Sequence, residues 1–179
     1  MKKILAAALA LCLLCSVCAY AETAKVDETL YEGAYLTICE AFDMYLPIDW
    51  YDYTEVLAEE YSDDDMAVGA VIGNEDLTCT LVVSYITPEI IANEFGVESL
   101  EELGEQLVAD DYTDVEIIEV NEIVMLTCVA AEKYADAKIV YVPDVNGGLY
   151  MLTFVPASDE EFAAMTDNMI ASISPTEAE

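Results

Sequence analysis

Apolar and polar side chains alternate along several short segments of the chain, which is the pattern of half-buried β-strands. Strand signals begin at Ala34. The clearest alternation begins at Phe42, which shares one face of the predicted strand with Met44 and Leu46. Pro47 ends this strand, because proline lacks the N–H that a central ladder requires.

A β-hairpin is predicted over residues 66–86. Its two strands, 66–72 and 77–86, are joined by Gly73-Asn74-Glu75-Asp76, which has the chemistry of a turn. Both faces of the second strand are moderately apolar. We therefore expect a central strand that is covered on both sides.

Two helices are predicted after this hairpin. Thr87 can cap the first, Pro88 suits its opening position, and Gly96 stops it. Ser99-x-x-Glu102 has the form of a capping box and opens the second helix. The apolar stripe of that helix consists of Leu100, Leu103 and Leu107.

Four further strands and a last helix complete the pattern. The strands are predicted at 115–120, 123–131, 138–142 and 149–155. Ser158-x-x-Glu161 is a second capping-box pattern and predicts the start of the helix, which Pro175 ends. Its predicted core positions are Phe162, Met165, Met169, Ile170 and Ile173.

This order of elements predicts an α+β fold, with a central antiparallel β-sheet and helices packed on it. We expect one domain over residues 34–174, preceded by a flexible lead-in at 22–33 and followed by a polar tail at 175–179. A mature chain of about 158 residues is long enough to bury a sizeable core.

The first 21 residues have the features of a secretory signal peptide. Lys2 and Lys3 form a basic start, residues 4–17 form an apolar stretch, and Ala19-Tyr20-Ala21 offers the small residues that precede a cleavage site. We therefore expect cleavage after Ala21 and a secreted or extracytoplasmic protein. No later apolar run approaches the length that spans a bilayer, so no membrane insertion is expected after the leader is removed.

The charge is strongly one-sided. The whole chain has 5 basic and 37 acidic residues, and it has no His. Lys2 and Lys3 leave with the leader, whereas every acid stays, which gives the mature chain a net charge of about −34. This charge excludes an electrostatic footprint for nucleic acid or for an anionic membrane. It instead gives a self-repelling surface that can attract cations or basic partners.

Three cysteines remain after the leader: Cys39, Cys79 and Cys128. None forms a C-x-x-C pair, so neither a zinc knuckle nor a thioredoxin-like site is indicated. Their strand-like apolar surroundings favour buried thiols. A Cys79–Cys128 bridge is the alternative that the odd count leaves open.

The layout resembles the Mog1/PsbP-like fold, a small α/β/α sandwich around an antiparallel sheet. The local match is the segment FDMYLPIDW from Phe42 to Trp50, and the glycine turn at 147–148 before the final strand and helix matches as well. Members include photosystem accessory proteins, a Ran-binding factor and bacterial envelope proteins. The resemblance implies non-catalytic accessory or binding work, and it transfers no functional residue to this chain.

Catalytic signatures are missing from the sequence. Without His there is no Ser-His-Asp or Cys-His arrangement, and no phosphate-binding glycine loop is present. The sequence therefore predicts no catalytic, cofactor-binding or metal-binding residue. Among so many acids two carboxylates could still meet, which leaves a carboxylate-dependent hydrolase as a remote alternative.

Calcium is the best remaining chemical candidate, because hard cations prefer several oxygen ligands. The acids at 59–60 and the run Ser62-Asp63-Asp64-Asp65 place oxygen donors close together. Adjacent acids of an extended segment point in opposite directions, which weakens a single site. Asp144-x-Asn146-Gly147 resembles part of an EF-hand loop, but a tight β-turn is the better interpretation.

The only Trp, Trp50, lies in a predicted turn beside Tyr45, Tyr51 and Tyr53. These side chains are expected to form an aromatic cluster, either at the edge of the core or as a binding patch. The first functional hypothesis is accordingly a secreted, non-catalytic binding domain of unknown ligand or partner. An exposed groove near Trp50 would support this hypothesis, and a fully buried Trp50 would weaken it. An extracytoplasmic calcium-binding protein is the alternative.

Overall fold

The structure is a computed structural model that describes residues 26–61, 67–130 and 135–176. Its main element is a seven-stranded sheet in which every neighbouring pair is antiparallel. In spatial order the strands are β3 (Tyr51–Asp52), β4 (Ala67–Gly73), β5 (Thr80–Ile86), β9 (Leu149–Val155), β8 (Lys138–Pro143), β7 (Ile123–Val129) and β6 (Thr113–Val120).

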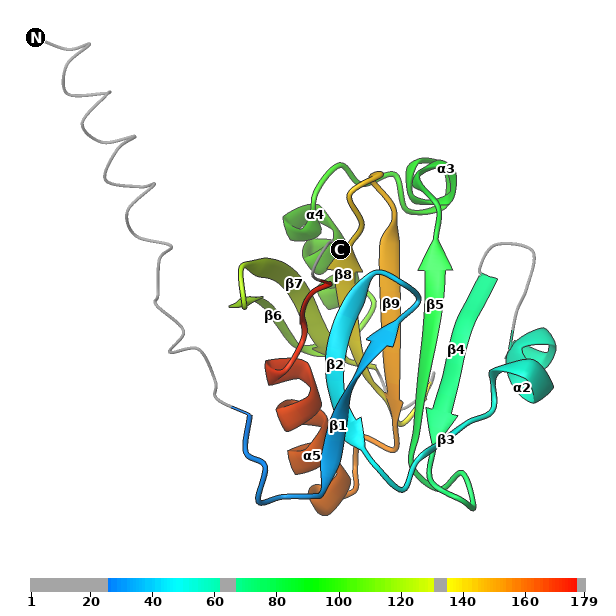
Figure 1. Cartoon of the computed structure of the whole chain (residues 1–179). Coiled ribbons are helices and arrows are strands. Elements are labelled where there is room, and N and C mark those ends of the chain that lie inside the picture. The colour runs from blue at the N-terminus through cyan, green and yellow to red at the C-terminus, as the bar shows by residue number, and fades with distance from the viewer. Residues whose placement is uncertain (1–25, 62–66, 131–134, 177–179) are drawn as a thin grey trace, which may run out of the picture.

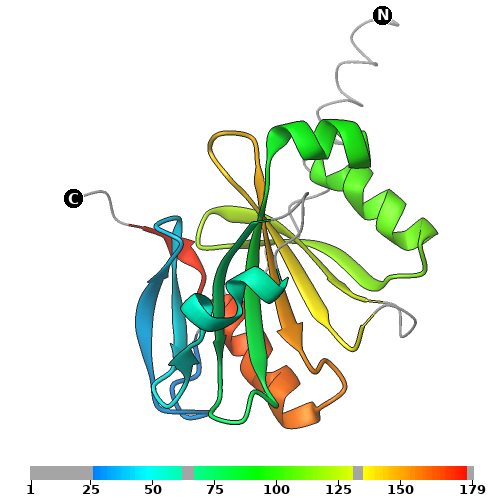
Figure 2. The same cartoon turned by 90° about the vertical axis from the view of Figure 1, so that its right-hand side faces the viewer.

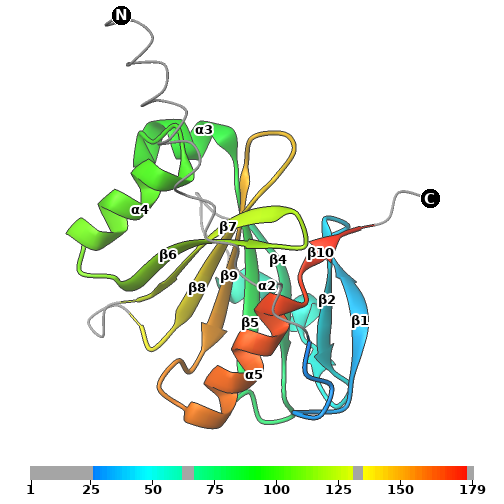
Figure 3. The ribbon, with the colours of Figure 1, turned by 90° about the vertical axis from the view of Figure 1, so that its left-hand side faces the viewer.

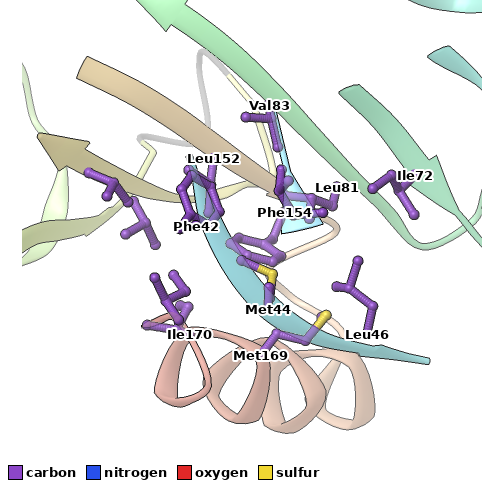
Figure 4. Packing of buried hydrophobic residues seen from close by; sticks show 14 of the residues in the cluster. Phe42, Met44, Leu46, Ile72, Leu81, Val83, Leu152, Phe154, Met169 and Ile170 are labelled. Atoms are coloured by element: carbon purple, nitrogen blue, oxygen red, sulfur yellow. The ribbon is translucent and has the colours of Figure 1, made fainter. Parts of the chain in front are cut away.

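A second, three-stranded sheet packs on one face of the large sheet (Figure 1). It consists of β1 (Gly33–Ile38), β2 (Phe42–Pro47) and β10 (Ser174–Pro175), with β2 in the middle. The alternation predicted for β2 is confirmed, because Phe42, Met44 and Leu46 are buried in the core. Figure 4 shows these three side chains between the last helix and the large sheet.

Helices surround the large sheet at several places. They are α2 (Thr54–Tyr61), α3 (Pro88–Ile90), the π-helical turn η1 (Ile91–Phe95), α4 (Leu100–Ala109) and α5 (Glu160–Ala171). Helix α5 shares a face with the small sheet, and α3 and α4 cover the other face. Helix α2 lies against β4 at one border of the sheet (Figures 1 and 2).

The large sheet therefore separates two apolar clusters. One lies between the sheet, β2 and α5, and includes Leu81, Phe154 and Met169. The other lies beneath α3 and α4, and includes Leu103 and Leu126. Strand β5 and its neighbours are covered on both faces, and both faces of these strands carry apolar side chains. This arrangement is the one expected for the second strand of the predicted hairpin.

The predicted caps of the first two helices are confirmed. Thr87 Oγ1 accepts the backbone N–H of Ile90 at 3.3 Å. Ser99 Oγ accepts the N–H of Glu102 at 3.2 Å, and the Glu102 carboxylate accepts the N–H of Glu98 at 2.8 Å. Each bond satisfies an N–H that the first helical turn would otherwise leave unpaired.

The predicted boundaries of the last helix were wrong. Its N-cap is Asp159, whose Oδ1 accepts the N–H of Phe162 at 2.8 Å, and not Ser158. Ser158 instead hydrogen-bonds the Asp136 carboxylate. The helix also ends at Ala171, before Pro175, because Ser174 and Pro175 pair with β2 as strand β10.

The start of the described chain is attached to the body of the protein. The backbone N–H of Asp27 donates to Asn168 Oδ1 of α5 at 2.6 Å. Tyr31 stacks on Tyr45, with ring centroids 5.4 Å apart. Residues 1–25, which contain the expected signal peptide, lie outside the described part of the chain.

The predicted α+β class is confirmed, because the structure combines helices with antiparallel sheets. Strands dominate, and one face of the large sheet is covered by a second sheet as well as by a helix, so the arrangement is more sheet-rich than helices on a single sheet. Among the described residues, no helix is both long and apolar enough to cross a bilayer.

Candidate functional site

A groove lies between the small sheet and the β3–α2–β4 border of the large sheet. It encloses about 510 Å³. Its floor is apolar and its rim is polar, and we call it the Trp50 groove. It is lined by Leu36, Thr37, Ile38, Cys39, Leu46, Pro47, Trp50, Asp52, Thr54, Glu55, Gly69, Ala70 and Ile72.

The β1–β2 turn forms one wall of the groove, and two of its residues have positive φ angles. Cys39 and Glu40 are its central residues, with φ values of 51° and 57°, and the N–H of Ala41 donates to the carbonyl of Ile38 at 2.9 Å. Turns of this type favour Asn and Gly, because other residues are strained at positive φ. This turn conformation places Cys39 among the residues that line the groove.

Gly69 on β4 makes room for this thiol. A Cβ atom at position 69 would lie 2.7 Å from Cys39 Sγ, which is closer than real contacts allow. The strand register also shifts between Val68 and Ala70, so the bulge and the glycine together accommodate Cys39. The wall of the groove is therefore built by direct contact between the small sheet and β4.

Cys39 is suited to packing and not to nucleophilic attack. Its burial, together with the nearby negative charge of Asp52, raises the pKa of the thiol. Both effects disfavour the thiolate, which is the reactive form of cysteine. The thiol consequently stays protonated at neutral pH and contributes a soft, apolar surface to the groove.

Trp50 connects the groove to the core. The backbone N–H of Trp50 donates a hydrogen bond of 3.2 Å to the carbonyl of Pro47, and this bond closes the turn that brings the indole into this position. The ring lies 5.9 Å from that of Phe162 on α5, while the residue is only partly buried. The packing fixes the orientation of the indole, and its accessible part lines the groove.

Carboxylates stand on the rim near the start of α2. Asp52 Oδ1 accepts the N–H of Thr54 at 2.8 Å, and Thr54 Oγ1 in turn accepts the N–H of Val71 at 2.9 Å. These bonds fix the entry of α2 against β4. Asp52 and Glu55 are both exposed, so the rim is anionic and open to solvent.

The predicted aromatic cluster was wrong in its membership. Tyr45 packs with Tyr31 and Tyr35 on the outer side of the small sheet, with ring centroids 5.4 and 5.3 Å apart. Tyr51 and Tyr53 form a separate pair at 6.2 Å. Trp50 is therefore the only one of the four predicted members that lines the groove.

The cysteine alternatives are resolved by the structure. Cys39, Cys79 and Cys128 are free thiols. Cys79 packs against the cluster beneath the small sheet and Cys128 belongs to the cluster beneath α4, so the alternative of a Cys79–Cys128 bridge was wrong. Burial raises the pKa of the Cys128 thiol to about 12, which makes it inert at neutral pH.

The two calcium candidates have different outcomes. The run at 62–65 lies outside the described residues, so calcium binding there stays an alternative hypothesis. Asp144 to Gly148 form the expected tight turn, in which the N–H of Asn146 donates to Asp144 Oδ2 at 3.1 Å and Gly147 has a φ of 85°. Within 26–61, 67–130 and 135–176, no three acidic or cysteine side chains gather as metal ligands would.

No protein-family model matches the chain, and no curated protein matches it.

Proposed function

We propose that the chain is a secreted, non-catalytic binding domain whose ligand occupies the Trp50 groove. The observation that carries the proposal is the groove itself, because it places a fixed indole on an apolar floor that solvent can reach. Ligand sites commonly combine concave apolar surface with a few polar groups that set the orientation.

The chemistry of the lining favours a small ligand with an apolar body and a cationic group. Leu36, Trp50 and Ile72 offer apolar contact, while Asp52 and Glu55 supply negative charge at the mouth. A cation near the rim would gain from both carboxylates, and an indole face also attracts cations. An anionic ligand would meet repulsion from the same groups.

Several features support binding in place of catalysis. The thiol of Cys39 has a raised pKa and is a poor nucleophile. Asp52 and Glu55 are exposed, whereas a carboxylate that acts as a general acid at neutral pH requires burial or a close like charge. The lining residues that the structure describes include no His, Lys or Arg that could assist either group.

The proposal includes a secreted location and a distant relation to the Mog1/PsbP-like fold. The leader at 1–21, with cleavage after Ala21, supports the location. The antiparallel sheet with packed layers on both faces supports the relation, as does the segment from Phe42 to Trp50, which leads from β2 into the groove. Accessory and binding roles are what that fold class would imply.

Trp50 makes the proposal directly measurable, because it is the only Trp in the chain and its fluorescence reports on this groove alone. Mature protein is titrated with octyltrimethylammonium, octyl glucoside and octyl sulfate, each kept below its micelle concentration. We expect a saturable change in Trp50 emission with the cation, a weaker response to the neutral glucoside, and none with the sulfate.

Matched variants separate the groove from the general surface charge. Leu36→Ser removes an exposed apolar contact in the groove and should weaken binding about tenfold, since roughly 1.5 kcal/mol of apolar burial is lost. Val145→Ser, at a side chain that is 98 % exposed outside the groove, should leave binding unchanged. Equal binding by both variants, or no saturation with the wild type, would reject the proposal.

A further inference from the structure

Strand β6 forms an open edge of the large sheet. The opposite border is closed, because β3 and α2 lie against β4. On its outer side β6 has no partner among the strands that the structure describes. Figure 3 shows β6 at this border, next to α4. An edge of this kind presents unpaired N–H and C=O groups to which an extended chain can bind.

The register identifies which backbone groups point outward. A two-residue turn, Asn121-Glu122, joins β6 to β7 and has positive φ values of 47° and 70°. In such a hairpin the closing pair, Val120 and Ile123, is hydrogen-bonded, and bonded and non-bonded pairs then alternate. The backbone groups of Ile117 and Glu119 are consequently directed away from β7.

An apolar groove lies beside this edge, between α4 and the outer strands, and we call it the edge groove. It encloses about 480 Å³ and is lined by Glu101, Gly104, Glu105, Val108, Val115, Ile117 and Leu126. Gly104 faces the sheet, since a Cβ there would lie 3.4 Å from Leu126 Cδ1, at ordinary van der Waals distance. Val108 and Ile117 are 60 % and 42 % exposed, so solvent reaches apolar surface on both walls.

Charge distinguishes between possible occupants of the edge groove. Glu101 and Glu105 line its helical wall, and Glu119 is exposed on the edge strand. A second copy pairing through β6 would bring these acids against their own equivalents, and each mature chain carries a net charge of about −34. A strand that carries Lys or Arg would instead be attracted.

We propose that β6 and the edge groove bind an extended basic segment of a partner protein by strand addition. Its backbone would hydrogen-bond the outward groups of Ile117 and Glu119. Its alternate side chains would then point to opposite faces of the sheet. Those on the α4 side would contact Val108 and Ile117, and flanking Lys or Arg side chains would approach Glu101 and Glu105. This site is separate from the Trp50 groove.

The first experiment uses defined peptides as probes. A fluorescein-labelled, end-capped peptide with the sequence Lys-Lys-Thr-Val-Thr-Val-Lys-Lys is titrated with mature protein, and fluorescence anisotropy is measured. Both Val side chains of this peptide share one face of the strand with a Lys on either side of them. A matched peptide with one central Val replaced by Pro keeps the charge but cannot complete the ladder. We expect saturable binding of the first peptide, and binding at least tenfold weaker for the second. Equal binding of the two would overturn strand addition in favour of non-specific charge attraction.

Two variants at one position test the edge itself. Glu119→Pro removes the outward N–H, and Glu119→Gln removes the same charge while it keeps that N–H. Binding should fall at least tenfold with Glu119→Pro but less than threefold with Glu119→Gln. Glu101→Lys combined with Glu105→Lys should also weaken binding at least tenfold, whereas Glu28→Lys, at an exposed position near α5, should not. A proline variant that binds like the glutamine variant would reject the proposal.

Hydrogen exchange of the wild-type protein gives a test that needs no variant. Saturation with the peptide that contains both Val residues should slow exchange of the Ile117 and Glu119 amides at least tenfold, because peptide carbonyls would then accept hydrogen bonds from these amides. Slowing confined to other strands would overturn the assignment. A dimer of the free protein that Glu119→Pro dissociates would place a second copy at the edge and would also overturn it.

Discussion

The hydroxyl oxygen of Ser172 accepts a hydrogen bond from the backbone N–H of Tyr45 at 2.8 Å, and both residues are buried. The bond joins the end of α5 to β2, the middle strand of the small sheet. It provides an acceptor for an N–H that lies beyond the short pairing of β2 with β10. Helix and small sheet therefore depend on each other as well as on the apolar cluster beneath them.

Ser172→Ala should lower the free energy of unfolding by about 1–3 kcal/mol, since it leaves the buried N–H of Tyr45 without this acceptor. Urea unfolding followed by far-UV circular dichroism measures the change. Ser174→Ala, at a partly exposed position of β10, is the control and should stay within about 0.5 kcal/mol of wild type. Equal effects of the two substitutions would show that the Ser172 bond contributes nothing specific.

Asp159→Ala should destabilise α5 by about 0.5–2 kcal/mol, because Asp159 supplies the capping oxygen for Phe162. Asp159→Asn keeps an oxygen at this position and should cost much less. Ser158→Ala removes only an exposed hydrogen bond to Asp136. Urea unfolding measures these changes in the free energy of unfolding. A larger decrease with Ser158→Ala than with Asp159→Ala would mean that Ser158 is the N-cap, as the sequence pattern predicts.

The α5 cap also shows how far local patterns determine the fold. Ser158 and Asp159 both carry capping oxygens, and the sequence spacing fits the first, but the bond between Asp136 and Ser158 holds that side chain elsewhere. Asp136 lies 22 positions away in the sequence, so no local pattern reports this contact. By contrast, Thr87 and Ser99 have no such competitor within the described part of the chain, and their predicted caps formed.

The Trp50 groove could be predicted only in part. The turn around Trp50 follows from Pro47 and the alternation of β2, which are local features. The opposite wall depends on α2 and on Gly69, whose role is apparent only once Cys39 packs against it. Helix α2 was not predicted from its sequence, and its contacts with β4 stabilise it instead.

Alkaline pH should destabilise the protein through Cys128. Burial raises the pKa of this thiol from about 9 to about 12 in the folded state. Above pH 9 the unfolded chain therefore loses a proton that the folded chain keeps. This contribution to stability is complete below pH 9 and is lost progressively between pH 9 and 12. Between pH 9 and 10 the contribution of this group to the slope should approach about 1.4 kcal/mol per pH unit, and the unfolded chain's tyrosines add to the total slope as they begin to ionise.

Cys128→Ala tests this assignment. The variant should be less stable at pH 7, because a buried side chain is shortened, but its stability should decline less steeply than that of the wild type between pH 9 and 10. Urea midpoints measured at pH 7, 8, 9 and 10 give both slopes. Parallel curves across this range would mean that Cys128 is not the group responsible.

Added salt should stabilise the protein, because the net charge of −32 of the chain favours expansion and mobile ions screen that repulsion. Thermal melts in NaCl, MgCl₂ and CaCl₂ at equal ionic strength, each against EDTA, separate screening from binding. Since neighbouring acids of the run at 62–65 are expected to point in different directions, Ca²⁺ and Mg²⁺ should raise Tm equally.

A ligand that prefers the folded state would instead give a saturable, concentration-dependent rise in Tm. Such a rise with Ca²⁺ alone, abolished by Asp63→Asn combined with Asp65→Asn, would establish a calcium site in that segment and contradict this expectation.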